Sequence, residues 1–309
     1  MTRTYTKMNE IFDKLIIRVL IAIIICALLY LYKFAHLLLY PTANKQVNAK
    51  FFPAQNSADS IHFFSRIIGI GIIFSSINFD IGNGIMIGIV DLCILSAVSF
   101  ILYLASLFIV DGIALYNFEY EDEILKRKNH CYATIAASNA VALGFIINKS
   151  LLTSNGSLIL ILFMWLLAIA LFGFSSKLYF LLSRFQFNKL IIQKNMALAF
   201  SYSGYILGFT MVIVSSIDQP VRSIENYTVN VILKIILSLI IFPIFRYGII
   251  HIFSLTDVIG KKGKNDTNLN IDDPNMGQGI FEGALLFTSF YLTTVITGYI
   301  SYGKIYPEY

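Results

Sequence analysis

The stretch QKNMALAFSYSG, residues 193–204, decides how this chain folds, because an asparagine stands where a long apolar run begins. Asn195 is followed by Ala197 and Ala199, so small residues occupy the second and fourth positions after it. An asparagine at a helix N-cap accepts a hydrogen bond from a backbone N–H that has no partner within the helix. Because hydrocarbon supplies no water for that N–H, the pattern predicts a membrane-spanning helix that starts at Asn195.

The composition of the whole chain supports a membrane protein. Of its 309 residues, 57% are hydrophobic and only 13% are charged, whereas soluble domains carry about 25% charged residues. Apolar runs that approach or exceed the roughly 20 residues of a transmembrane helix occur at 15–40, 57–77, 85–115, 130–147, 157–182, 196–216, 228–255 and 278–302. The predicted fold class is therefore all-α, a polytopic membrane protein with a single membrane domain over residues 1–309.

The asparagine pattern recurs at the start of every second span. Small residues stand two and four positions after each of Asn56, Asn129, Asn195 and Asn275. The repeated unit is a long span, a polar connection and a second span, at about 13–80, 84–148, 157–217 and 228–302. Because each unit has two spans, all units enter the membrane from the same side, as parallel repeats. Both a pseudo-fourfold and a nested twofold arrangement fit this pattern.

The four asparagines have two interpretations. In the first, each caps its helix, and the small residues after it let neighbouring backbones approach closely, as is common in membranes. In the second, the four side chains and the positive ends of the four helices converge on an anion or a lipid headgroup. The sequence leaves both open.

Basic residues in the connections predict the orientation. The connections after the first, third, fifth and seventh spans carry eleven lysines and arginines, and the opposite side carries six. Since cytoplasmic loops are enriched in these residues, we expect the first set to be cytoplasmic and both termini to be periplasmic. The eleven are Lys45, Lys50, Lys126, Arg127, Lys128, Arg184, Lys189, Lys194, Lys261, Lys262 and Lys264.

Ionisable residues inside the spans are candidates for function, because they are costly in a bilayer unless they pair, face the interior or reach its surface. We expect Arg18, Lys33 and Lys234 to reach the surface. Asp111 and Lys177 hold equivalent positions in adjacent units and are expected to pair, and Arg66 with Asp91 is a second expected pair. Structural ion pairs and a path for a proton or solute both remain open. The remaining members of this set are Arg246 and Glu282.

Enzyme chemistry has no sequence support. The chain has no GxSxG, HExxH or P-loop motif, and its four histidines are scattered. The three cysteines, Cys26, Cys93 and Cys131, lie in apolar runs and are expected to be buried, free thiols. We therefore expect no enzymatic activity, no cofactor and no metal.

Two stretches resemble the core motif of the bacterial "domain of unknown function 350" family. They are EILKRKNHCYATIAASNAVALGFII at 123–147 and KLIIQKNMALAFSYSGYILGFTMVI at 189–213. The family's unit is a helix with a Tyr-containing end, a short polar connection, and Asn-x-Ala-x-Ala opening a Gly-rich helix. Arg246 resembles a basic residue near the end of the family's penultimate helix. The chain looks like a doubled member with four units, although the first unit departs at Asp59, Phe64 and Arg66.

The resemblance implies a bacterial inner-membrane protein from a family without established activity, whose members often occur beside membrane-stress proteins. Our first hypothesis is a non-enzymatic membrane-stress or envelope-maintenance component that engages lipid or partner proteins through basic clusters such as 126–128. The alternative is a channel or transporter for an ion or small solute, lined by the asparagines and Asp111. Expected partners are the bilayer, stress proteins and a second copy of the chain. Nucleic acid is not expected, because the basic residues are spread over short loops.

Overall fold

The computed structural model describes residues 2–43, 55–75, 85–183, 186–253, 275–298 and 300. Within these ranges the chain is helical with turns, and eight helices are long and apolar enough to cross a membrane. The predicted all-α polytopic fold is confirmed. The eight are α1 (Thr2–Leu39), α3 (Ser57–Phe74), α4 (Ile85–Ala114), α5 (His130–Thr153), α6 (Leu158–Leu182), α8 (Met196–Ile217), α9 (Ile224–Ile252) and α10 (Met276–Thr297).

Three short helices lie in the described parts of the connections. The 3-10 turn η1 covers Pro41–Ala43, the π-helix η2 covers Glu121–Lys126 and the helix α7 covers Phe187–Ile192. Several basic residues that predicted the orientation fall outside the described ranges. They are Lys45, Lys50, Arg184, Lys261, Lys262, Lys264 and, on the opposite side, Lys304.

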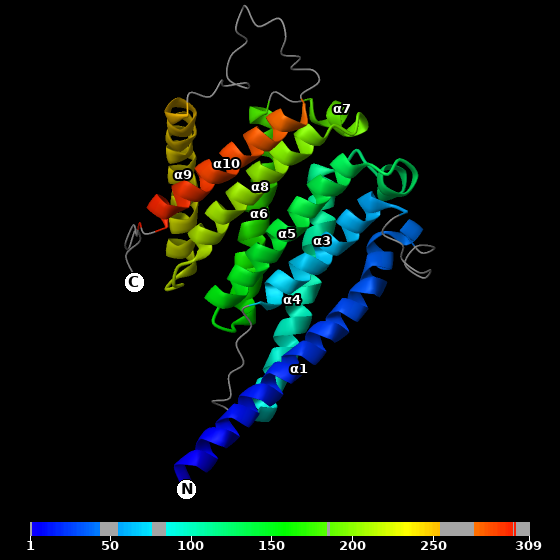
Figure 1. Ribbon diagram of the computed structural model, residues 1–309. Coiled ribbons are helices and arrows are strands. Elements are labelled where there is room, and N and C mark those ends of the chain that lie inside the picture. The colour runs from blue at the N-terminus through cyan, green and yellow to red at the C-terminus, as the bar shows by residue number, and fades with distance from the viewer. Residues whose placement is uncertain are drawn as a thin grey trace, which may run out of the picture.

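The spanning helices form two layers (Figure 1). Helices α3, α5, α8 and α10 lie side by side in this order and run in the same direction, so the units are parallel. Helices α1, α4, α6 and α9 form the second layer and run the other way. The first layer is an open row with α3 and α10 at its ends. It differs from the closed ring that pseudo-fourfold symmetry would produce.

Glycines set the close spacing within the row. A Cβ atom on Gly204 of α8 would overlap the backbone of Gly283 in α10. Between α3 and α5, a Cβ atom on Gly144 would lie 2.8 Å from the carbonyl oxygen of Gly69. Since real Cβ atoms do not come this close to backbone, these helix pairs can pack only with glycine at the crossing point.

The helix ends differ from the predicted spans where polar side chains find partners. Helix α5 continues to Thr153, beyond the predicted end at 147. Asn148 there donates to the carbonyl oxygens of Ile72 (2.8 Å) and Ile73 (3.1 Å) at the end of α3. Lys149 pairs with Asp218 at 2.6 Å. The polar side chains of Asn148 and Lys149 lower the hydropathy of this segment, so the predicted span ended too early. The contacts with the end of α3 and with Asp218 give both side chains partners.

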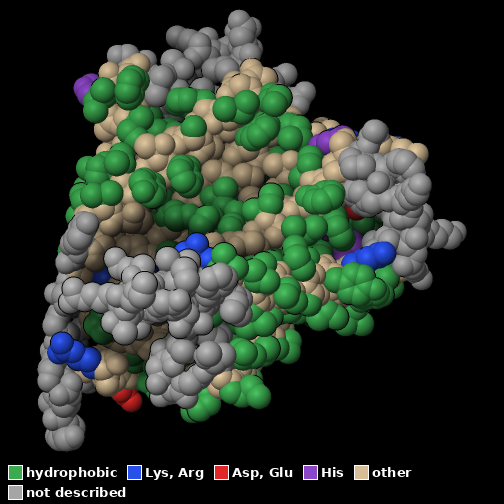
Figure 2. Space-filling model, turned by 60° about the horizontal axis from the view of Figure 1, so that its bottom comes forward, with side chains coloured by type: hydrophobic (Ala, Val, Ile, Leu, Met, Phe, Trp, Pro, Cys, Tyr) green, Lys and Arg blue, Asp and Glu red, His purple; other side chains and the backbone are tan. Residues whose placement is uncertain are grey.

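Apolar side chains cover much of the outer surface (Figure 2). Such an exposed apolar surface suits contact with lipid tails. Cys26 and Cys93 are exposed on α1 and α4, and only Cys131 is buried, so the expectation of three buried thiols was wrong for two of them. Neither of these helices is packed on all sides, and each has exposed apolar side chains, such as Leu31 and Phe34 on α1 and Ile94 and Ile101 on α4. All three thiols are free.

Candidate functional site

All four predicted asparagines are N-caps of parallel helices, and we call the side of the bundle where they lie the capped side. Each side-chain oxygen accepts at least one backbone N–H near the start of its helix, which satisfies a donor that the helix itself leaves open. The donors are Asp59 for Asn56, Cys131 and Tyr132 for Asn129, Ala197 for Asn195, and Gln278 for Asn275.

The cap side chains also join neighbouring units. The amide of Asn56 donates to the carbonyl oxygen of Ile124 at 2.9 Å, and that of Asn129 donates to Ile191 at 2.8 Å. Each of these residues thus binds the connection of the next unit along the row. The row places the first and last caps at opposite ends of the layer. Ligand binding by the asparagines stays a prediction.

The side chains of the basic cluster 126–128 bind neighbouring parts of the protein, although Lys126 and Lys128 stay exposed, so contact of this cluster with lipid headgroups stays a prediction. Lys126 pairs with Glu121 (3.1 Å) and Asp122 (2.8 Å). Arg127 pairs with Glu123 at 2.6 Å and also donates to a carbonyl oxygen of the third unit. Lys128 donates to the carbonyl oxygen of residue 55 in the first unit at 2.9 Å. The acids are close in sequence and the carbonyls belong to other units, and the basic run alone did not reveal either kind of partner.

Asn129→Ala should destabilise the protein more than Asn275→Ala. Asn129 is fully buried and also donates to Glu123 at 2.6 Å, whereas Asn275 is exposed. We expect a loss of about 2 kcal/mol or more for the buried cap and about 1 kcal/mol for the exposed one. Thermal unfolding in detergent measures both, and equal losses would contradict a joining role for Asn129.

A network of charged and aromatic side chains fills the first half of the molecule, between α1, α3 and α4 near the capped side. Its centre is Arg66 of α3, which has no exposed surface. The guanidinium donates to the carbonyl oxygen of His62 at 2.7 Å and to the hydroxyl of Tyr40 at 2.8 Å. Asp111 of α4 lies 3.5 Å away and accepts from Tyr40. Three elements thus neutralise one buried cation, and Nη1 and Nη2 of Arg66 have partners, whereas its Nε has none among the described residues.

Tyrosines at the rim of the network act as hydrogen-bond donors. Burial raises the pKa of both Tyr40 and Tyr120 well above the usual value for tyrosine, so both keep their protons. Tyr120, just before η2, donates to Asp59 at 2.6 Å. The network therefore reaches from Asp111 inside the bundle to the connections on the capped side.

Two histidines that looked scattered in the sequence come together in this network. The rings of His36 and His62 have centroids 5.9 Å apart, because the end of α1 lies beside the start of α3. His62 is fully buried, and neither of its ring nitrogens has a hydrogen-bond partner among the described residues. The described residues hold no group of three or more metal-ligand side chains.

Both predicted pairs of intramembrane charges were wrong. Arg66 pairs with Asp111, while Asp91 is exposed near the other end of α4. Lys177 lies over the rings of Tyr116 and Phe180, with its ammonium 5.3 and 5.8 Å from their centroids. The packing of α3 against α1 and α4 within one half decided these partners, and equivalent positions in successive units do not predict such packing.

Lys234 also departs from expectation. It is buried, and its ammonium lies 3.5 Å from the carbonyl oxygen of Gly298 at the end of α10. We expected it to extend to the membrane surface. The carbonyl groups at a helix end offer a cation a nearer partner than the surface does.

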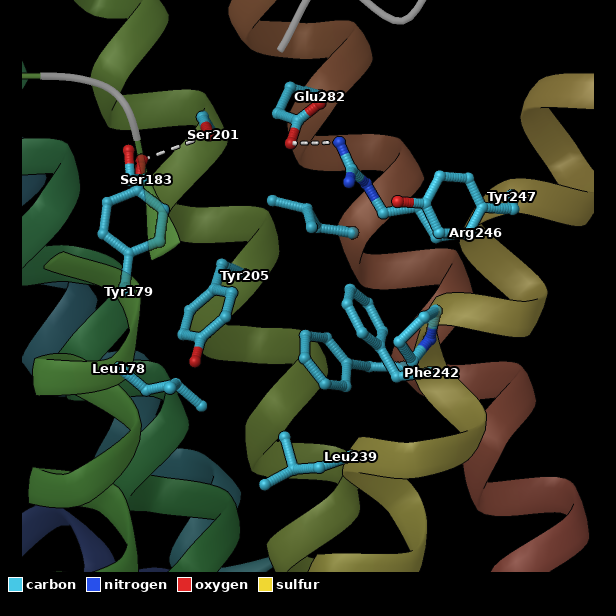
Figure 3. A pocket seen from close by; sticks show the side chains of 13 residues that line it. Leu178, Tyr179, Ser183, Ser201, Tyr205, Leu239, Phe242, Arg246, Tyr247 and Glu282 are labelled. Atoms are coloured by element: carbon cyan, nitrogen blue, oxygen red, sulfur yellow. Dashed lines mark hydrogen bonds and ion pairs between the residues drawn. The ribbon is translucent and has the colours of Figure 1, made fainter. Parts of the chain in front are cut away.

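The second half has a cavity of about 430 Å³ between α6, α8, α9 and α10 (Figure 3). Its polar end, toward the capped side, holds Arg246 of α9 and Glu282 of α10, 3.6 Å apart. Nearby, Tyr179 donates to Ser201 at 3.1 Å. Apolar side chains line the deeper part, and they include Leu178, Leu239, Phe242 and Phe290. The cavity is therefore amphipathic along its length.

Tyr205 borders the same cavity with an unused hydroxyl. Its ring lies between Tyr179 and Phe242 (Figure 3). The residue is 3% exposed, and its hydroxyl has no hydrogen-bond partner among the described residues. A buried polar group without a partner costs about 1–3 kcal/mol. This hydroxyl is a buried donor that no described residue uses.

The network and the cavity occupy equivalent places in the two halves. Arg66 stands ten residues after its cap (66 − 56), and Tyr205 stands ten residues after its own (205 − 195). Six residues after the same caps stand His62 and Ser201. Charged side chains thus occupy in the first half the space that is an open cavity in the second half. The sequence analysis identified Arg246 and Glu282 as candidate residues. It missed Tyr179, Ser201 and Tyr205, and only their distances in sequence from the caps would have indicated these three residues.

The fold and these interiors define a polytopic helical membrane protein built from two related halves of four spans each. The family described as Domain of Unknown Function (DUF350) matches residues 10–151 and, separately, residues 153–296. The chain belongs to this family, and the two matches correspond to the two halves. No curated protein and no solved structure matched the chain.

Proposed function

We propose that this protein is a non-enzymatic membrane component that holds a lipid in the cavity of its second half. The observation that carries the proposal is the amphipathic cavity, with Arg246 and Glu282 at one end and apolar side chains along the rest. Its volume of about 430 Å³ lies within the range of about 300–1,000 Å³ typical of ligand pockets. Part of an acyl chain and the adjoining head would fit it.

The two charges favour a zwitterionic headgroup. Arg246 and Glu282 are side chains with 17% and 8% exposure, so both are largely withdrawn from water. A purely anionic head would gain from the arginine and be repelled by the glutamate. A head with a phosphate and an ammonium group can give each charge a partner, and charge-assisted hydrogen bonds of this kind are the strong ones.

In the cell, we place this activity in a bacterial inner membrane, with the capped side in the cytoplasm and both termini in the periplasm. The excess of basic residues in the connections of the capped side supports this orientation. The role we propose is envelope maintenance or the response to membrane stress. In this role, the presence of lipid in the cavity is signalled to a partner protein or to a second copy of the chain. The family resemblance is the support for this context.

The double variant Arg246→Met/Glu282→Gln should weaken binding of dioleoyl phosphatidylethanolamine by roughly tenfold or more, because two charge-assisted contacts are lost. It removes both charges together, so neither is left unpaired in the bundle. Native mass spectrometry of the full chain in detergent measures the affinity.

Lys149→Met/Asp218→Asn is the matched control, because it removes another ion pair at the far side from the caps. Leu239→Trp, which fills the cavity and leaves its charges in place, should also weaken binding. Unchanged lipid affinity in both cavity variants would refute the proposed site.

A second candidate is conduction of an ion or small solute through the first half. The buried network around Arg66 favours it, because ionisable groups inside membrane spans often mark solute pathways. The network ends at Tyr103, which donates to the carbonyl oxygens of Arg66 and Ala140 at 3.2 Å each. Beyond it, α3 and α5 bury Ile70, Ile73, Leu143 and Ile147. The packed apolar side chains there make lipid binding the better supported function.

A further inference from the structure

A second cavity opens at the surface of the capped side, where α6 ends and α7 follows. It measures about 460 Å³ and lies at the end of α4 as well. Its polar lining comes from Lys177, Gln186, Asn188 and Lys189, and its aromatic lining includes Tyr116 and Phe180. This cavity is distinct from the lipid cavity described above, because the two have no lining residue in common.

The charge of this cavity is positive and locally uncompensated. It is lined by two lysines and by no acidic residue. In the described part of the chain, neither Lys177 nor Lys189 forms a salt bridge, whereas Lys126 and Arg127 on the same side each pair with acids of η2. Two ammonium groups and two side-chain amides provide hydrogen-bond donors here, and no negatively charged acceptor lines the cavity. This is the chemistry that recognises a phosphate group.

Aromatic rings hold the deeper lysine at the edge of the apolar zone. The ammonium of Lys177 lies 5.3 Å from the ring centroid of Tyr116 and 5.8 Å from that of Phe180. Tyrosine is enriched at the level of lipid headgroups, and a lysine near a helix end reaches the same level. Tyr116 is 64% exposed, so the cavity opens toward the surface where headgroups lie.

We propose that this cavity binds the phosphate of an anionic phospholipid, with Lys177 and Lys189 as its cationic contacts. A free phosphate compound shares the same chemistry, but the aromatic side and the position of the cavity at the membrane surface favour the lipid. This site should prefer a different lipid from the cavity of the second half, because Glu282 in that cavity repels a headgroup with a net negative charge. It does not depend on lipid binding in that cavity.

Lipid titration followed by native mass spectrometry tests the proposal on the full chain in detergent. The probes are dioleoyl phosphatidylglycerol, dioleoyl phosphatidylethanolamine and inorganic phosphate. In Lys177→Gln/Lys189→Gln, the affinity for phosphatidylglycerol should fall roughly tenfold or more, because each basic residue near an anionic lipid contributes appreciably. The affinity for phosphatidylethanolamine should stay unchanged. Both lysines are exposed, so the melting temperature should also stay unchanged.

The matched control is Lys126→Gln/Lys128→Gln, which removes the same number of charges from the same side. It should leave the affinity for phosphatidylglycerol unchanged, since those lysines already have partners. An equal loss in this control, or no loss in Lys177→Gln/Lys189→Gln, would overturn the site. Displacement of the lipid by millimolar inorganic phosphate would show that the site binds free phosphate and not a lipid.

The variant Arg246→Met/Glu282→Gln should bind phosphatidylglycerol normally, so failure of one site is distinguishable from failure of the other.

Discussion

Gly204→Ala is expected to prevent α8 and α10 from packing and to lower the free energy of unfolding by about 3 kcal/mol or more. The new Cβ atom would overlap backbone atoms of Gly283, not the end of a flexible side chain. Only a separation of the two helices can relieve this overlap. Because both helices line the cavity of the second half, we also expect this cavity to lose its shape.

The control for this change is Gly248→Ala, at a glycine inside the neighbouring helix α9. A Cβ atom there would meet nothing within 4 Å. Since alanine favours a helix over glycine by about 1 kcal/mol, Gly248→Ala should leave the melting temperature unchanged or raise it. Thermal unfolding in detergent compares the two variants. A Gly204→Ala protein as stable as its Gly248→Ala counterpart would show that α8 and α10 do not cross at this point.

Arg66→Met is expected to cost about 3–5 kcal/mol, which is typical of removing one partner from a buried ion pair. Asp111, with 19% of its side chain exposed, would lose its cation, and the hydroxyl of Tyr40 would lose its acceptor role toward Arg66. The double variant Arg66→Met/Asp111→Leu should recover most of this loss, because it leaves neither charge unpaired. Melting temperatures of the two variants measure the difference.

The same double variant separates a structural network from a pathway. If the network is structural, vesicles reconstituted with Arg66→Met/Asp111→Leu should be as tight to ions as vesicles with the native chain. A specific solute flux in the native protein that this stable variant abolishes would favour conduction instead. Lys126→Met provides the control for a solvent-exposed pair and should leave the melting temperature unchanged, because water and salt screen such pairs.

The sequence was sufficient for the number of spans, their parallel repetition and the caps. These features depend on local chemistry: about 20 apolar residues cross a bilayer wherever they occur, and an asparagine caps the helix that follows it. Asn195 could therefore be assigned from QKNMALAFSYSG alone, and Asn56, Asn129 and Asn275 from the same pattern. Arg66 and Tyr205 also stand at the same distance in sequence from their caps, so the sequence already held their equivalence. That equivalence could be recognised only once the interiors of both halves were known.

The partners of the charged residues could not be obtained in this way. Pairing depends on which helix faces lie together, and a repeat pattern does not specify whether units form a ring or a row. Lys177 and Asp111 were matched by position in the repeat, yet α3 places Arg66 beside Asp111 and leaves Lys177 on aromatic rings. The acids of η2 likewise neutralise part of a basic run that looked free in the sequence.

By itself, the sequence determined that this protein is a helical membrane protein with four capped, parallel units, because hydropathy and capping act within a few residues of one another. Only the tertiary structure decided that the units form an open row, that one half buries a charged network and that the other keeps a cavity. Those outcomes depend on contacts between helices far apart in the chain, such as Gly204 with Gly283 and Arg246 with Glu282. Such contacts exist only after the helices have packed.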